Sequence, residues 1–258
     1  MRLALFYLVL IIGAEVATNV FHLTQGVVFH GVILTGLLIH ASRTANPSGR
    51  NFLLVLCLAP LTRIMSLSMP LTGFPVVFWY LIIYPPLFLA AWLIGKQLKY
   101  TASEIGLNLQ KLRLQLGIAL TGFVFGAAEY YILKPEPLIP ELTWAKVLLP
   151  AFILVVCTGF VEEFMFRGVI QRASINTLGG WGLIYTALLF AGLHLIHFSA
   201  NPWDIAFVFA VGLFFGWAVN KTGSLLGVTL SHGITNITLY LMMPFLFSSI
   251  PQLSSWFV

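Results

Sequence analysis

The stretch Val161-Glu-Glu-Phe-Met-Phe-Arg-Gly-Val-Ile-Gln171 carries three charged side chains in a chain that is otherwise suited to lipid. Its acids are Glu162 and Glu163, its base is Arg167, and residues 152–160 before them carry no charge. Ionisable groups inside a membrane segment are costly and usually serve a function. The stretch therefore indicates a membrane-spanning helix with a site inside it.

The composition of the whole chain agrees with this interpretation. Hydrophobic residues make up 59% of the sequence, charged residues 8%, and the mean hydropathy is +0.97. Soluble domains carry about 25% charged residues. We therefore predict an all-α polytopic membrane protein that forms a single domain, residues 1–258.

Apolar runs along the chain predict about nine transmembrane helices, in a bundle whose core lies in the C-terminal half. About 20 apolar residues cross a hydrocarbon core about 30 Å thick. The predicted spans are residues 3–21, 26–41, 52–69, 76–94, 114–133, 144–170, 181–197, 203–219 and 224–243. Arg2 before the first run is typical of a signal peptide, but Glu15 interrupts the run and no clear cleavage site follows, so we interpret it as a retained span.

Three parts of the chain are expected within the single domain. Residues 1–113 hold the N-terminal spans and a cytoplasmic connector, and residues 114–243 hold the core. Residues 244–258 lack charge and carry four aromatic side chains, which predicts a short tail at the membrane interface.

Lysine and arginine are unevenly distributed between the predicted loops. If the N-terminus is cytoplasmic, ten of these residues lie on the cytoplasmic side, only Lys134 and Lys146 lie outside, and Arg63 lies within the third span. The positive-inside rule then predicts a cytoplasmic N-terminus and an external C-terminus. The net charge of +5 is explained by this bias, so the expected partner is the lipid bilayer and not a nucleic acid.

Polar side chains of three spans, the sixth, the seventh and the ninth, share one depth. At a rise of 1.5 Å per residue, Glu162, His194, His232 and Asn236 lie roughly 12 to 20 Å from the cytoplasmic ends of their spans. Such a layer predicts a cavity, open toward the cytoplasm, that these four side chains face. A carboxylate and an imidazole in a cavity can activate water by general acid and base catalysis.

The helical period separates the two adjacent glutamates. Glu163 and Arg167 are four residues apart, so we expect them to pair on one helix face as a structural ion pair. Glu162 would point about 100° away. It is therefore the carboxylate that we expect to face the histidines.

Three short motifs occur in a fixed order along the chain: Glu162-Glu163-x-x-x-Arg167, Phe190-x-x-x-His194 and His232-x-x-x-Asn236. This order resembles the CAAX protease and bacteriocin-processing family of intramembrane proteases, also called the ABI family. The resemblance implies a hydrolase with a multi-helix membrane fold and a conical or bundled catalytic core in residues 114–243. It also implies a peptide or protein substrate, prenylated or bacteriocin-like.

The resemblance also implies roles for the motif residues. Glu162 and His194 would activate a water that attacks a peptide carbonyl, and His232 and Asn236 would stabilise the oxyanion or otherwise complete the site. The remaining motif residues are expected to support them; these are Glu163, Arg167 and Phe190.

A metal-assisted mechanism stays open beside the glutamate-dependent one. Two histidines and one glutamate make an open zinc site, for which Glu162, His194 and His232 would be the ligands. The sequence lacks the compact H-E-x-x-H helix that would favour such a site strongly.

Two further classes of protein remain open. A non-catalytic immunity or scaffold protein on the same fold would use the cavity for binding. A proton-coupled transporter would use Glu162, Glu15 and Glu129 as a relay, but no inverted repeat supports alternating access. We favour a structural role for Glu15, Glu129 and Arg63, as a buried ion pair between spans.

Overall fold

The computed structural model describes residues 1–69, 71–195 and 201–248, and every regular element in these ranges is a helix. The predicted all-α polytopic membrane fold is confirmed, and the chain is an integral membrane protein. The N-terminal helices are α1 (Arg2–Val20), α2 (Leu23–Arg43), α3 (Pro47–Leu56), α4 (Leu58–Ser68) and α5 (Val76–Gln97).

The described residues of the C-terminal part form α-helices and π-helical segments, and the latter are labelled η. In chain order they are α6 (Leu112–Leu133), α7 (Trp144–Ile153), η1 (Leu154–Glu162), η2 (Phe164–Ile170), α8 (Gln171–Leu178), α9 (Trp181–Gly192), α10 (Pro202–Thr222), α11 (Leu226–Ile237), η4 (Thr238–Met242) and α12 (Met243–Ser248).

Seven of the nine predicted spans meet a length and apolarity criterion for crossing a membrane within the described residues. In the seventh predicted span, helix α9 ends at Gly192, and residues 196–200 lie outside the described part. The ninth runs from α11 through η4 into α12. The tail predicted at 244–258 begins as part of α12, and residues 249–258 lie outside the described part.

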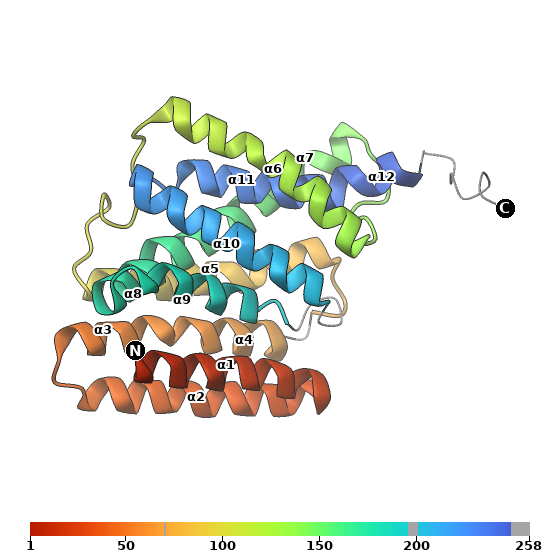
Figure 1. Cartoon of the computed structure of the whole chain (residues 1–258). Coiled ribbons are helices and arrows are strands. Elements are labelled where there is room, and N and C mark those ends of the chain that lie inside the picture. Colours follow the sequence, from red (N-terminus) through yellow and green to blue (C-terminus); the bar gives the residue numbers. More distant parts are fainter. Residues whose placement is uncertain (70, 196–200, 249–258) are drawn as a thin grey trace.

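The helices lie in layers, with α1 and α2 at one side, α3 and α4 next to them, then α8 and α9, and finally α10, α11 and α6 (Figure 1). Small residues allow the closest approaches between layers. A Cβ added at Gly159 of η1 would lie only 2.7 Å from the carbonyl oxygen of Thr229 in α11. Glycine at this position therefore lets η1 and α11 touch, which brings their polar side chains together.

The connector between α5 and α6 packs against the helix ends at one side of the molecule. Glu104 forms an ion pair with Arg172 at 3.1 Å. Hydrogen bonds from the main-chain N–H and the hydroxyl of Thr101 hold the pKa of Glu104 below its ordinary value. The main-chain N–H of Leu225 donates to the carbonyl of Gly106 at 2.9 Å, which fixes the connector against the start of α11.

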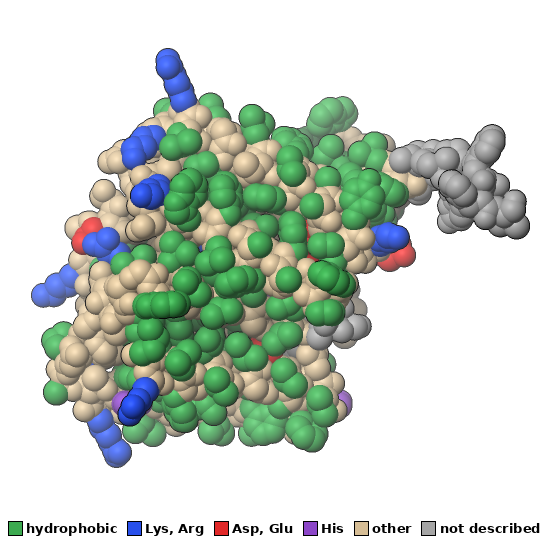
Figure 2. Space-filling model, viewed as in Figure 1, with side chains coloured by type: hydrophobic (Ala, Val, Ile, Leu, Met, Phe, Trp, Pro, Cys, Tyr) green, Lys and Arg blue, Asp and Glu red, His purple; other side chains and the backbone are tan. Residues whose placement is uncertain are grey.

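Charged side chains gather at one end of the molecule. Figure 2 shows most lysines and arginines at the end where α1 begins and α2 ends, while the surface between the two ends is largely hydrophobic. An apolar belt between polar ends is the surface that a bilayer requires.

The orientation in the membrane stays a prediction, and cysteine labelling tests it. The native Cys57 and Cys157 are buried, so a new cysteine at exposed Ser103 or exposed Glu141 gives a clean signal. An impermeant thiol reagent added to intact cells should label Glu141→Cys and leave Ser103→Cys unlabelled until the cells are opened. Labelling of Ser103→Cys in intact cells would reverse the predicted orientation.

Candidate active site

The sixth span departs from α-helical geometry where it carries the charged motif. η1 and η2 are π-helical, and Glu163 lies between them. π-Helical turns are rare and frequent at functional sites, and their i→i+5 hydrogen bonds give a wider turn than the 3.6 residues of an α-helix. Consecutive side chains therefore diverge by less than the α-helical angle of about 100°.

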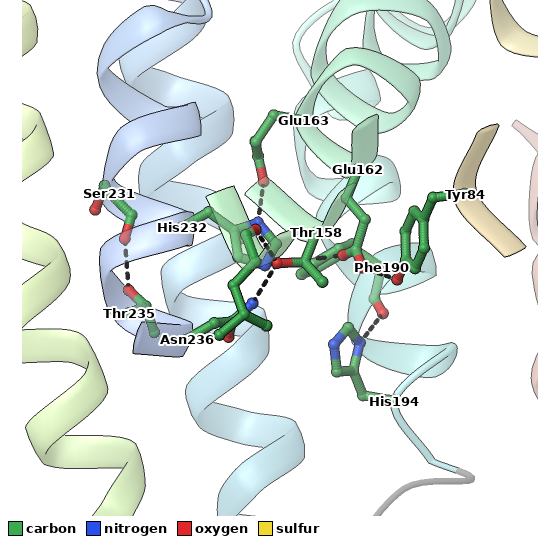
Figure 3. Close-up of polar contacts among 12 residues, drawn as sticks. Tyr84, Thr158, Glu162, Glu163, Phe190, His194, Ser231, His232, Thr235 and Asn236 are labelled. Carbon is green, nitrogen blue, oxygen red and sulfur yellow. Dashed lines mark hydrogen bonds and ion pairs between the residues drawn. The ribbon is translucent and has the colours of Figure 1, made fainter. Parts of the chain in front are cut away.

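Both adjacent glutamates reach His232 of α11 as a result (Figure 3). The Nδ1 atom of His232 lies 2.8 Å from Oε1 of Glu163, and its Nε2 atom lies 3.9 Å from Oε2 of Glu162. An ionised carboxylate only accepts hydrogen bonds, so the contact with Glu163 assigns a hydrogen to Nδ1. Nε2 is then the ring nitrogen on the side of Glu162.

The expected ion pair between Glu163 and Arg167 is present, with 3.0 Å between Oε1 and Nη1 and both side chains buried. The same oxygen of Glu163 also contacts His232, a contact that helical spacing within one segment did not predict. The π-helical turn and the glycine contact at Gly159 explain the second contact, since they bring α11 within reach of this face.

Glu162 has a further partner that the sequence analysis missed. The hydroxyl of Tyr84, in α5, donates to Oε1 of Glu162. Tyr84 directly precedes Pro85 and Pro86 inside an apolar helix. Its position in the sequence does not distinguish it from the other large side chains of that helix. Only the packing of α5 against η1 identifies it.

His194 lies in the turn that follows α9. Its Nδ1 atom lies 2.8 Å from the carbonyl oxygen of Phe190, and the two rings are 4.7 Å apart. Because a carbonyl only accepts, Nδ1 carries the hydrogen and the neutral ring has its acceptor at Nε2. Phe190 also packs under the guanidinium of Arg167, at 4.3 Å from the ring centre. It therefore connects the first two motifs.

Asn236 lies one turn after His232 and forms a hydrogen bond with the π-helical segment η1. Its Nδ2 atom donates to Oγ1 of Thr158 in η1 at 2.8 Å. An amide nitrogen carries two hydrogens, so one remains for another acceptor. Thr158 is a second residue that the sequence analysis missed.

A cavity of about 50 Å³ lies between these residues. His194, His232 and Asn236 line it, which is enough polar surface and volume for a water molecule. Glu162 is not among its lining residues and stands beside it, next to His232. Glu129 of α6 lines the cavity as well.

The position of Glu129 differs from the expected one. We expected Glu15, Arg63 and Glu129 to form a buried ion pair between spans. Glu15 and Arg63 do so, at 2.8 Å. Glu129 instead faces the cavity with the motif residues, because α6 packs against α11 on the opposite side of the core from α1.

The arrangement does not fit the zinc site considered above. Across residues 1–69, 71–195 and 201–248, no three His, Cys, Asp or Glu side chains lie close enough together to hold one metal ion. We therefore derive no step through a metal.

Comparison with known proteins agrees with the motifs. Residues 143–238 match the family model described as type II CAAX prenyl endopeptidase Rce1-like, and this match confirms the resemblance. No curated protein and no solved structure gave a significant match. The matched segment runs from the start of α7 to the end of α11 and contains all three motifs.

Proposed function

We propose that this chain, whose residues 143–238 match the type II CAAX prenyl endopeptidase family, is an intramembrane endopeptidase that hydrolyses a peptide bond with a water activated by Glu162 and His194. The observation that carries the proposal is the water-sized cavity lined by His194, His232 and Asn236, with the Glu162 carboxylate beside it. A peptide or protein in the membrane is the substrate class that the family implies.

Activation of water requires a base, and proton delivery to the leaving amine requires an acid. The Glu162 carboxylate and Nε2 of His194 can accept a proton and release it again. Nε2 is the acceptor nitrogen of the neutral His194 ring, because Nδ1 carries the hydrogen that is donated to the carbonyl of Phe190. The water oxygen forms a bond to the carbonyl carbon, and its proton passes to this pair. The same proton then moves to the amine nitrogen as the peptide C–N bond breaks.

The oxyanion that forms on the carbonyl needs hydrogen-bond donors. Asn236 can supply the second hydrogen of Nδ2, since the first is given to Thr158. His232 can supply Nε2–H when its ring is protonated, and the Glu163 carboxylate at Nδ1 stabilises the positive charge of that form.

The direct test is hydrolysis by purified protein. A set of prenylated and unmodified peptides, incubated with the wild type in detergent or liposomes, should yield a cleavage product detectable by mass spectrometry. Work in H₂¹⁸O should place the label in the new carboxylate. Absence of any product from well-folded protein would favour a non-catalytic immunity or scaffold role on the same fold.

Asn236→Ala should lower kcat by about 10²- to 10³-fold, as expected for the loss of one oxyanion donor. The measurement is steady-state hydrolysis of the peptide identified above. Asn108→Ala is the matched control, because Asn108 lies in the connector outside the cavity, where it donates to the carbonyl of Gly223 after α10. An Asn236→Ala protein with the kcat of the control would remove Asn236 from the mechanism.

A further inference from the structure

The turn that carries His194 is held by helices outside the matched segment. The guanidinium of Arg63, in α4, donates through Nη2 to the carbonyl oxygen of Leu193. The side-chain amide of Asn19, in α1, donates to the carbonyl oxygen of Leu195 at 2.8 Å. The main chain on both sides of His194 is therefore anchored to the N-terminal helices.

Arg63 is fixed in turn by Glu15, which also contacts His30. Its Nε atom donates to Oε1 of Glu15 in α1 at 2.8 Å, and Nε2 of His30 in α2 lies 3.4 Å from the same oxygen. All three side chains are at most 4% exposed. A guanidinium offers several N–H groups in a rigid plane. Nε of Arg63 therefore binds Glu15 while Nη2 of the same group binds the main-chain carbonyl of Leu193.

Stability alone is a weak reason for such a group. Removing two charges from water costs about as much as their attraction returns, and apolar side chains often hold helices together equally well. Ionisable side chains inside a membrane protein generally mark functional positions. Here Arg63 of the charged pair donates to the carbonyl oxygen of Leu193, the residue before the candidate catalytic His194. Apolar packing would not hold this carbonyl group in place.

We propose that Arg63, oriented by Glu15, is a positioning residue that fixes the His194 turn for catalysis. The proposal rests on the proposed function, since it assigns to His194 a catalytic task. It gives the N-terminal helices a role in the reaction, although the matched segment does not include them. An imidazole displaced by about 1 Å costs up to about 10²-fold in rate.

Arg63→Lys separates positioning from simple charge pairing. A lysine keeps a positive charge beside Glu15, but its single ammonium group does not replace the planar fork that reaches both partners. We expect near wild-type thermal unfolding, a kcat lowered about 10- to 100-fold and an unchanged KM. Arg50→Lys, at an exposed position in α3, is the matched control and should behave as wild type.

Hydrogen exchange tests the same proposal without any activity. The amides of His194 and Leu195 donate to the carbonyls of Ala191 and Gly192 at 3.0 and 3.2 Å. Loosening of the turn in Arg63→Lys should speed deuterium uptake at these amides relative to the control. This readout stands even if the protein proves to have no peptidase activity, so failure of the proposed function and failure of the positioning role are distinguishable.

Asn19→Ala keeps the test valid if Arg63→Lys does not fold. It removes the second anchor of the turn without disturbing a charge, and faster exchange at Leu195 with a lower kcat is expected. Unchanged exchange and unchanged kcat in the folded variants would overturn the proposal. A raised KM with unchanged exchange would overturn it as well, because that result indicates an effect on substrate binding.

Discussion

Glu162→Gln is expected to lower kcat by about 10²- to 10⁴-fold or more, with expression and thermal unfolding close to wild type. The glutamine is nearly isosteric and can still accept the hydrogen bond from Tyr84, so the fold loses little. It cannot take a proton from water. His194→Ala should have an effect of the same order, because the second partner in proton transfer is lost.

Peptide hydrolysis by purified variants is the measurement, and Glu141→Gln, at an exposed position, is the matched control. Retained hydrolysis in Glu162→Gln would contradict the assignment of the base. If Glu163→Gln were instead stable and inactive while Glu162→Gln stayed active, the catalytic carboxylate would be the neighbouring one. Retained biological function without hydrolysis would favour the immunity or scaffold role.

The second large effect is expected on stability, at the buried pair of Glu163 and Arg167. Removing either partner, as Glu163→Gln or Arg167→Gln, leaves one buried charge unpaired and should destabilise the protein by about 3 to 5 kcal/mol. The exchange Glu163→Arg with Arg167→Glu should restore part of this stability, because opposite charges again lie one turn apart. It should not restore activity, since it places a cation where Glu163 now contacts His232.

Denaturation in mixed micelles, followed by activity, measures both parts of this prediction. Arg172→Gln is the matched control, because its ion pair with Glu104 is 40% exposed on both sides and an exposed pair contributes about 0 to 1 kcal/mol. Equal stability of Arg167→Gln and the control would contradict the prediction. Restored activity in the exchanged variant would show that Glu163 does not act through His232.

Local and compositional features of the sequence determined the fold class. Apolar runs of membrane length predict helices wherever they occur, and the chain is an all-helical membrane protein as a result. The pairing of Glu163 with Arg167 was predictable too, because it depends only on helical spacing within one segment. The order of the three motifs gave the resemblance to a family, and residues 143–238 match a model of that family.

Only the tertiary structure decided how the site is assembled. The partners Tyr84 and Thr158, the contact of Glu163 with His232, and the anchoring of the His194 turn by Arg63 all join different helices. Spacing along the chain carries no information on which helices pack together. The prediction for the adjacent glutamates also assumed 3.6 residues per turn, and this period does not hold in η1 and η2. The wider π-helical turn, packed against α11 through Gly159, brings both carboxylates to one imidazole.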